Sequence, residues 1–81
     1  MFNVYVLKSL KNGRRYIGFT GKPPEQRLTE HNSGANQFTR HNKPFKLVYF
    51  EIFEDKMESL KREKFLKSGQ GRKFLDSIIP R

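Results

Sequence analysis

The sequence FNVYVLKSLKNGRRYIGFT, residues 2–20, predicts two antiparallel strands joined by a tight turn. Residues 2–9 are rich in valine and aromatic residues, which are typical of a strand. Asn12-Gly13 is a strong hairpin signal, because both central residues of a type I′ turn need positive φ. Residues 14–20 then form the returning strand.

The register of this hairpin gives it a polar and an apolar face. If Asn12-Gly13 are the two central turn residues, Gly18 lies opposite Leu7. The strand period of two then puts Tyr5 and Tyr16 on one face, with Gly18 between them as a gap through which a phosphate can approach. The other face, which should belong to the core, carries Val4, Val6, Ile17 and Phe19.

The segment after the hairpin predicts one short helix and a long polar loop. Proline is tolerated in the first helical turn, so Pro23-Pro24 predicts a helix over residues 24–31. The run Asn32-Ser33-Gly34 should end it. Residues 35–44 are polar and irregular, and long connections of this kind often carry function.

A third strand and a second helix follow the loop. Residues 46–52, KLVYFEI, have an apolar centre and predict the strand. Asp55 can cap a helix over residues 56–67 through its carboxylate. Met57 and Leu60 should lie on the buried side of that helix.

The chain then predicts a last short helix and one domain. Gly69 and Gly71 should break the preceding helix, and residues 72–79 form another, closed by Pro80. The order ββαβαα, with a small three-stranded antiparallel sheet flanked by helices, predicts the α+β class. No linker or repeat interrupts the sequence, so we expect residues 1–81 to form a single domain.

The charge of the chain points to a polyanionic partner. Seventeen lysines and arginines stand against eight acidic residues, giving a formal net charge of +9. A domain this small and basic is most simply explained by nucleic acid. An anionic membrane surface is less favoured because the basic residues are scattered. A basic surface that only aids solubility is the remaining alternative.

Composition also indicates where the protein works. The chain has no cysteine, which excludes a disulfide framework and a cysteine-based zinc site. It lacks a secretory signal pattern and any stretch near the roughly 20 apolar residues that a membrane-spanning helix needs. We therefore expect a cytoplasmic protein without a membrane partner.

Five blocks of the sequence together resemble the GIY-YIG nuclease superfamily. The similarity is greatest to its small single-domain bacterial members, related to the nuclease module of excinuclease C. It extends from about residue 2 to 75, with the blocks in the order and spacing of the family. The blocks are VYVLKS (4–9), RYIGFT (15–20), RLTEHNSG (27–34), KPFKLVYFE (43–51) and LKREKFLKSG (60–69).

This resemblance implies a set of site residues. The first family triplet falls on Asn3-Val4-Tyr5, which keeps only the tyrosine, whereas Tyr16-Ile17-Gly18 is intact. The family's helical arginine corresponds to Arg27, its nearby histidine to His31 and its metal-binding glutamate to Glu63. Larger members also have an asparagine after that glutamate, whereas no asparagine follows Glu63 in this chain.

The resemblance also implies how the tyrosines act. Phosphodiester hydrolysis needs an activated water and stabilisation of the phosphate charge. A hairpin tyrosine is expected to act as general base or to position the water, first Tyr16 with Tyr5 in support. A free tyrosine has a pKa of about 10, so Arg14, Arg15 and Arg27 would have to stabilise the phenolate. The alternative is that both tyrosines are half-buried sheet aromatics with hydrogen-bonded hydroxyls.

Arg27 and His31 are four residues apart, so they project from one helical face. Arg27 offers a planar fork that matches a phosphate, although an arginine on an exposed helix is usually just solvated. His31 titrates near neutrality and can share proton transfer or hold phosphate. Alternatively, it interacts with the dipole at the helix C-terminus.

Glu63 is the candidate metal ligand. It lies between Leu60 and Leu66, at the border of the predicted buried stripe. One carboxylate, with water and substrate phosphate, suits a single Mg²⁺ (or Mn²⁺) ion. The alternative is a salt bridge with a neighbouring cation: Lys61, Arg62, Lys64 or Lys67.

Several further residues are expected to contact nucleic acid, chiefly through its backbone, which supplies affinity without reading sequence. Phe38 in the polar loop can stack on a base or serve as a packing anchor. The expected contacts are Arg14, Arg15, Gly18, Thr39, Arg40, Lys43, Lys67 and Arg72.

Three hypotheses of function follow. The first is a metal-dependent DNA endonuclease, acting in DNA repair, recombination or mobile-element biology. Its substrate stays open among branched, single-stranded or damaged DNA, or RNA. The second is a basic nucleic-acid-binding module that has lost turnover, motivated by the missing asparagine. The third is a structural or protein-interaction domain. Relatives of this kind often attach a specificity domain to the nuclease module, and this sequence has no room for one, so a targeting protein partner is possible. That partner and the oligomeric state stay open.

Overall fold

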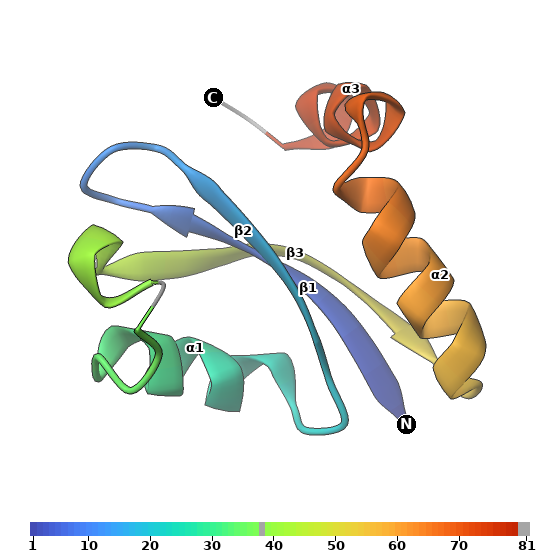
Figure 1. The fold of residues 1–81 in the computed structure, drawn as a ribbon, viewed down its shortest axis with the longest axis horizontal. Helices are drawn as coiled ribbons and strands as arrows, with labels where there is room; N and C mark the ends of the chain where they lie inside the picture. Colours follow the sequence, from blue (N-terminus) through green and yellow to red (C-terminus); the bar gives the residue numbers. More distant parts are fainter. Residues whose placement is uncertain (38, 80–81) are drawn as a thin grey trace.

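The structure is a computed structural model that describes residues 1–37 and 39–79. The sequence predictions for Phe38 and Pro80 therefore lie outside the described residues. The elements follow one another in the predicted order ββαβαα, which confirms the α+β class (Figure 1). They are β1 (Phe2–Ser9), β2 (Arg15–Thr20), α1 (Pro24–Asn32), the 3-10 helix η1 (Arg40–Asn42), β3 (Phe45–Phe53), α2 (Lys56–Leu66) and α3 (Gly69–Ile78).

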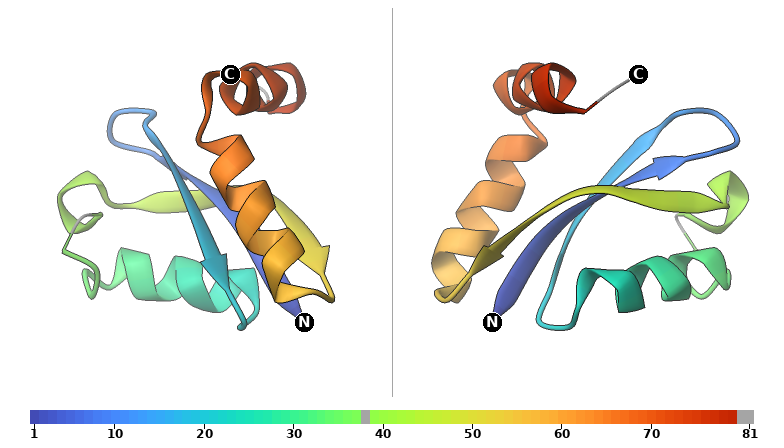
Figure 2. Two further views of the ribbon diagram at one scale, coloured as in Figure 1. Left: turned by 45° about the vertical axis from the view of Figure 1, so that its right-hand side comes forward. Right: turned by 180° about the vertical axis from the view of Figure 1, so that it is seen from behind.

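The strands form one antiparallel sheet in the order β2-β1-β3, so β1 is central. Helix α1 lies along one side of the sheet, while α2 and α3 lie on the other (Figures 1 and 2). None of the helices in the described part of the chain is both long and apolar enough to cross a membrane.

The hairpin turn differs from the prediction. Gly13 has a φ of 77°, whereas Asn12 does not have positive φ, so the type I′ turn is wrong. The Gly13 N–H donates to the Ser9 carbonyl, and the Ser9 N–H donates to the Arg14 carbonyl. The loop therefore spans residues 10–13, and the Ser9 hydroxyl stabilises it by accepting two backbone N–H bonds from within the loop.

This longer loop shifts the register by two residues. Gly18 pairs with Tyr5 and Tyr16 pairs with Leu7, whereas the sequence had predicted Gly18 opposite Leu7. A shift of two preserves which face each side chain occupies. Tyr5 and Tyr16 consequently still share one face of the hairpin.

The two faces of the sheet pack against different helices. On the side of α1, the buried residues Tyr5, Leu7 and Phe45 pack with Tyr16 and Leu28. On the opposite side lies a cluster drawn from β1, α2, α3 and the residue that follows α3. Its buried members are Val4, Val6, Leu66, Leu75 and Ile79.

Helix α2 begins as predicted, because the Asp55 carboxylate accepts a hydrogen bond of 3.0 Å from the Met57 N–H. Met57 itself is 61% exposed, so its predicted burial is wrong. Ser59 and Leu66 are the fully buried residues of α2, and they lie seven residues, about two turns, apart. Met57 in the first turn is off that inward-facing side.

The second glycine after α2 does not break a helix. Helix α3 starts at Gly69 and includes Gly71, contrary to the predicted start at residue 72. A Cβ at Gly71 would overlap the Phe65 carbonyl and the backbone of Leu66. Gly71 thus permits the close approach of α3 to the end of α2.

Candidate active site

Tyr5 lies at the centre of the polar cluster between the sheet and α1. It is 1% exposed, and its ring covers Gly18 on the neighbouring strand. A Cβ at Gly18 would overlap the Tyr5 phenol. The gap that the sequence predicted at Gly18 is therefore filled by the tyrosine ring, and the predicted approach of a phosphate to Gly18 is wrong.

A chain of hydrogen bonds connects Tyr5 to α1 and to the loop that follows it. The Tyr5 hydroxyl lies 3.2 Å from His31 Nε2, and His31 Nδ1 lies 2.7 Å from Thr39 Oγ1. Arg27 donates from Nε to the same Tyr5 hydroxyl at 3.4 Å and from Nη1 to Glu30 at 2.7 Å. The tyrosine, arginine and histidine predicted from the sequence thus meet in one cluster.

Burial controls the ionisation of this cluster. It raises the pKa of the Tyr5 phenol, and the hydrogen bond and charge of Arg27 only partly offset it. Burial also lowers the pKa of His31, and the charge of Arg27 lowers it further. Near neutral pH the cluster therefore holds a protonated phenol beside a neutral imidazole, which argues against a Tyr5 phenolate.

A neutral imidazole carries only one N–H, so its partners indicate the tautomer. If Nδ1–H donates to Thr39, Nε2 accepts the Tyr5 O–H, and the phenol oxygen is left to accept from Arg27. In the other tautomer the phenol oxygen would receive two N–H donors, and its own hydrogen would need a further buried acceptor. The hydrogen bonds of His31 therefore favour the Nδ1–H tautomer.

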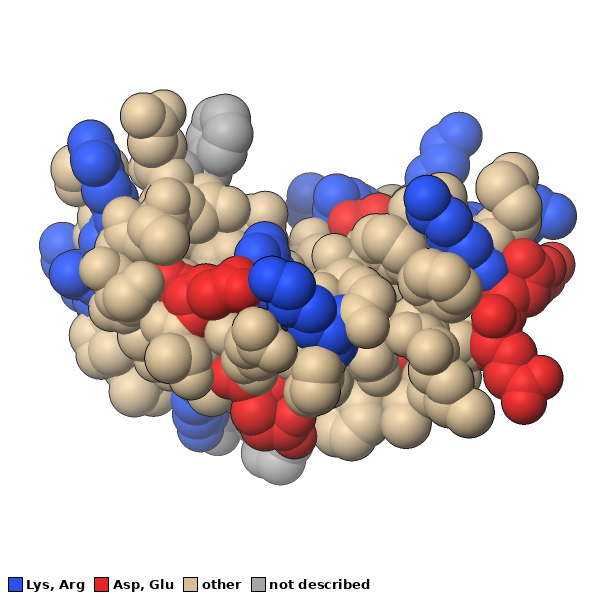
Figure 3. All heavy atoms as spheres, turned by 90° about the horizontal axis from the view of Figure 1, so that it is seen from below, with Lys and Arg blue, Asp and Glu red and all other residues tan. Residues whose placement is uncertain are grey.

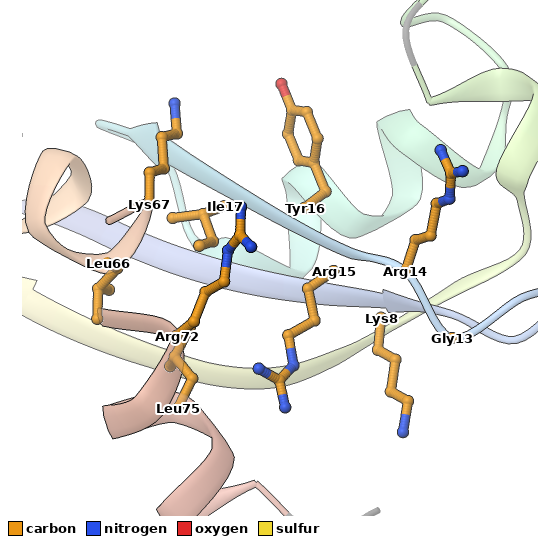
Figure 4. A pocket seen from close by; sticks show the side chains of 10 residues that line it. All are labelled: Lys8, Gly13, Arg14, Arg15, Tyr16, Ile17, Leu66, Lys67, Arg72 and Leu75. Atoms are coloured by element: carbon orange, nitrogen blue, oxygen red, sulfur yellow. The ribbon is translucent and has the colours of Figure 1, made fainter. Parts of the chain in front are cut away.

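Tyr16 differs from Tyr5 although it lies on the same face. Its ring centroid is 4.9 Å from that of His31, and its side chain is only partly buried. Within the described parts of the chain, no hydrogen-bond partner contacts its hydroxyl. Figure 4 shows the Tyr16 phenol pointing away from the strands, to the same side as the Lys67 ammonium. Of the two hairpin tyrosines, Tyr16 has the hydroxyl available for a substrate.

A groove of about 610 Å³ lies beside Tyr16, between the hairpin and the corner where α2 meets α3 (Figure 4). Four of the predicted nucleic-acid contacts line it, together with Lys8, which the sequence reasoning missed. The cations of the groove are Lys8, Arg14, Arg15, Lys67 and Arg72.

The opposite side of the molecule has a different charge pattern. Seen from the side of α1, basic and acidic side chains lie next to one another (Figure 3). Arg27 and Lys22 both pair with Glu30 there, at 2.7 and 3.5 Å. The unbalanced positive charge of the described site thus lies in the groove beside Tyr16.

Glu63 has a partly buried side chain, 20% exposed, and forms an ion pair of 3.2 Å with Lys67. Its charge reaches the cluster, since it contributes, after burial and the neighbouring tyrosine, to the raised pKa of Tyr5. The described residues contain no group of three histidine or acidic side chains that could hold a metal. A single carboxylate suits one Mg²⁺ that keeps most of its waters, and it does not suit a two-metal site.

The predicted contacts in the polar loop lie in two kinds of environment. Thr39 is 2% exposed and bonded to His31, so its burial does not suit the backbone contact predicted for it. Arg40 and Lys43 are exposed and lie outside the groove. The loop is tied to the hairpin, because the Ser9 hydroxyl donates to the Asn42 carbonyl.

Sequence reasoning missed two partners of the site. Glu30 holds Arg27, and their spacing of three residues on a helix was a usable signal. Thr39 holds His31 across eight residues that include the end of α1 and part of a loop. No periodic pattern in the sequence indicates that contact.

Comparison with known proteins finds a family match and several similar proteins. Residues 1–74 match the GIY-YIG family, described as the GIY-YIG catalytic domain. The UPF0213 protein SSP2268 of Staphylococcus saprophyticus is 38% identical over 76 residues, which span 93% of this chain and 90% of that protein. The UPF0213 protein CPE1444 of Clostridium perfringens is 45% identical over 65 residues, or 79% of this chain and 68% of that protein.

A solved structure has the same architecture. The solution NMR structure of the UPF0213 protein BH0048 from Bacillus halodurans superposes with a TM-score of 0.56 at 33% sequence identity. The match covers 95% of this chain and 84% of that one. The fold and the order of its elements are therefore shared with a small bacterial relative.

Proposed function

We propose that this chain, which belongs to the GIY-YIG catalytic domain family, is a metal-dependent endonuclease that hydrolyses backbone phosphodiester bonds of DNA. What supports the proposal is the convergence of Tyr5, Arg27 and His31 in one hydrogen-bonded cluster, with Tyr16 packed on the histidine. A role in DNA repair or recombination is part of this proposal.

In this proposal Tyr16 acts on the attacking water. Its hydroxyl has no partner within residues 1–37 and 39–79, so it can orient the water or take its proton. Tyr5 supports the site instead, because its hydroxyl is already engaged by Arg27 and His31 at 3.4 and 3.2 Å. Removing Tyr5 would release both of those side chains.

Arg27 is the proposed phosphate ligand. A guanidinium has five N–H donors, and two of its nitrogens are used by Tyr5 and Glu30. Its side chain is 29% exposed, so the remaining donors can reach a phosphate. His31 is fully buried and neutral, which suits a positioning residue for Tyr5 better than a phosphate ligand.

Glu63 is the residue that would hold one Mg²⁺ or Mn²⁺ ion. Such an ion, when bound, would stabilise the negative charge that develops on the phosphate. The Lys67 ammonium now neutralises this carboxylate at 3.2 Å. Binding of a cation by Glu63 would release Lys67 toward the groove that it lines.

A plasmid-nicking assay with Mg²⁺ tests the proposal. Wild-type protein should nick supercoiled DNA, and Tyr16→Phe should lower the rate by roughly 100-fold or more, the usual contribution of a general acid or base. Glu63→Gln should also abolish most of the activity. The matched controls, Tyr49→Phe and Glu58→Gln, alter residues outside the cluster and should stay active.

Two results would overturn this assignment. If the wild type, incubated with Mg²⁺ or Mn²⁺, leaves supercoiled, branched and single-stranded DNA intact, the endonuclease function is refuted. If Glu63→Gln is as active as Glu58→Gln, the assignment of Glu63 as the metal ligand is refuted. The competing function is a basic nucleic-acid-binding module without turnover, which the ion pair of Glu63 with Lys67 favours. That module would bind DNA in a salt-dependent way and leave it uncut.

A further inference from the structure

The groove beside Tyr16 concentrates positive charge that the protein itself neutralises only in part. Asp76 pairs with Arg15 at 2.7 Å, and Glu63 pairs with Lys67 at 3.2 Å. The other three cations, Lys8, Arg14 and Arg72, form no ion pair within the described residues. Such a groove suits an anion that carries several charges in a row.

The position of Tyr16 links this groove to the proposed active site. One side of its ring packs against His31, at a centroid distance of 4.9 Å, and the residue also lines the groove. A strand whose phosphate lies at the Tyr16 hydroxyl would continue between the hairpin and the α2–α3 corner. The groove is therefore continuous with the place where the scissile phosphate would bind.

The size of the groove limits what it can enclose. Its volume of about 610 Å³ falls within the range of roughly 300–1,000 Å³ typical of pockets for drug-sized molecules. A nucleotide unit is of that size, whereas a double helix is not. The two walls of the groove, the hairpin and the α2–α3 corner, come from different parts of the chain, and a single strand suits the space between them.

The lining also suits unpaired bases. Besides the cations, Tyr16 and Ile17 line the groove, and both residues are partly buried. Proteins that bind single strands combine a positively charged groove with an aromatic side chain on which a base stacks. In a duplex the faces of the bases are already stacked on one another, so they are not available for such a contact.

We propose that this groove binds an unpaired strand adjoining the scissile phosphate, so that the substrate is single-stranded nucleic acid or carries a single-stranded segment. This inference rests on the proposed endonuclease function for its active site. The phosphates contact the cations of the groove, and a base stacks on the Tyr16 ring.

Fluorescence anisotropy with EDTA present tests binding apart from cleavage. The probes are a labelled oligothymidine and the same oligonucleotide annealed to its oligoadenosine complement. Stacking of one base on an aromatic side chain is worth about 1–3 kcal/mol, so the single strand should bind about tenfold or more tightly than the duplex. Tighter or equal binding of the duplex would overturn the proposal.

Substitutions of groove residues test whether the strand binds in the groove. Lys8→Gln and Arg72→Gln should each weaken binding of the single strand and reduce the slope of log K against log salt by about 0.7, the value for one phosphate contact. Lys56→Gln is the control, because it also removes one positive charge, at the opposite end of α2 from the groove. Groove variants that behave like Lys56→Gln would overturn the assignment.

The endonuclease and the groove can fail separately. The protein could prefer the single strand, depend on Lys8 and Arg72 for this preference, and cut no nucleic acid. That result supports strand binding in the groove and refutes the endonuclease function. If the protein nicks DNA but binds the duplex more tightly, the endonuclease function is supported and the binding of an unpaired strand in the groove is refuted. Far-UV circular dichroism of each variant verifies the fold, since surface substitutions usually change stability by only about 0.5 kcal/mol.

Discussion

The two faces of the central strand β1 carry opposite kinds of packing. Val4 and Val6 point toward α2 and α3 and join a core of aliphatic side chains. Tyr5, between them, points toward α1 and joins His31 and Arg27 through hydrogen bonds. One strand thus supplies the apolar core on one side and the candidate active site on the other.

This difference indicates that residues on one face of β1 mainly stabilise the fold and that residues on the other face mainly form the candidate active site. On the α2–α3 side, close backbone approach and aliphatic burial hold the helices, as Gly71 and Leu66 illustrate. On the α1 side, the buried residues of the helix are Pro24 and His31, and a hydrogen-bond chain lies beside the packing of Leu7 and Leu28. Substitutions on the first side should therefore act mainly on folding, and those on the second mainly on activity.

The largest effect on stability is expected for Gly71→Ala. The new Cβ would overlap the backbone of Phe65 and Leu66, which cannot rotate away. We expect the free energy of unfolding to fall by about 3 kcal/mol, the upper end of the usual cost of overpacking. Urea unfolding followed by circular dichroism measures it.

The same substitution at Gly69 is the control. No atom lies within 4 Å of a Cβ there, and Gly69 is in the same helix. Ala at such a position usually stabilises by about 0.4–1 kcal/mol. Equal effects of the two alanines would refute the close approach of α3 to α2.

On the polar face, Thr39→Val keeps the shape of the side chain and removes its oxygen. The buried His31 Nδ1–H then lacks its acceptor, which should cost about 2 kcal/mol. Thr39→Ser keeps the hydroxyl and should preserve the contact. ¹⁵N NMR of the imidazole should show the Nδ1–H tautomer in the wild type and in Thr39→Ser, and a weakened preference in Thr39→Val. An Nε2–H tautomer in the wild type would contradict the assignment.

Gly18→Ala is a useful comparison with Gly71→Ala. At Gly18 the new Cβ would overlap a side chain, whereas at Gly71 it would overlap backbone atoms. The Tyr5 phenol must move away from the new Cβ, losing its bonds to Arg27 and His31. We expect a smaller loss of stability, about 1 kcal/mol, but loss of most nicking activity.

Gly21→Ala is the matched control for the polar face, since nothing lies within 4 Å of a Cβ at that position. Both its stability and its nicking rate should stay near those of the wild type. Full activity of Gly18→Ala would show that the position of the Tyr5 hydroxyl does not matter for turnover.

The smallest effect is the pH dependence that His31 gives to stability. Its pKa is lowered in the folded protein by burial and by the charge of Arg27, while Glu30 acts in the opposite direction. The unfolded chain therefore binds a proton first as the pH falls below about 6.5, and the stability contributed by neutral His31 is lost. Between about pH 7 and about pH 6 the loss should be at most about 0.7 kcal/mol.

Urea midpoints of the wild type and His31→Gln across this pH range measure that loss. The variant should be less stable overall but less sensitive to pH than the wild type. An identical pH dependence of the two proteins would show that His31 is not the group responsible.

Local signals in the sequence predicted much of the fold. Asp55 was identified as a helix cap because the interaction joins neighbouring residues. The hairpin register was wrong by two positions, since the Ser9 hydroxyl and Gly13 build a longer loop than Asn12-Gly13 suggested. Gly71 was interpreted as a helix breaker, because its function depends on a second helix that packs against it.

The sequence by itself determined that Tyr5 and Tyr16 share a face, because alternation along a strand is a local property that a shift of two residues leaves unchanged. Only the tertiary structure decided that the two tyrosines differ. Helix α1 and Thr39 bury Tyr5 against His31, while Tyr16 stays partly exposed beside a cationic groove. Burial and hydrogen bonding depend on which distant segments cover a side chain, and no local pattern specifies that.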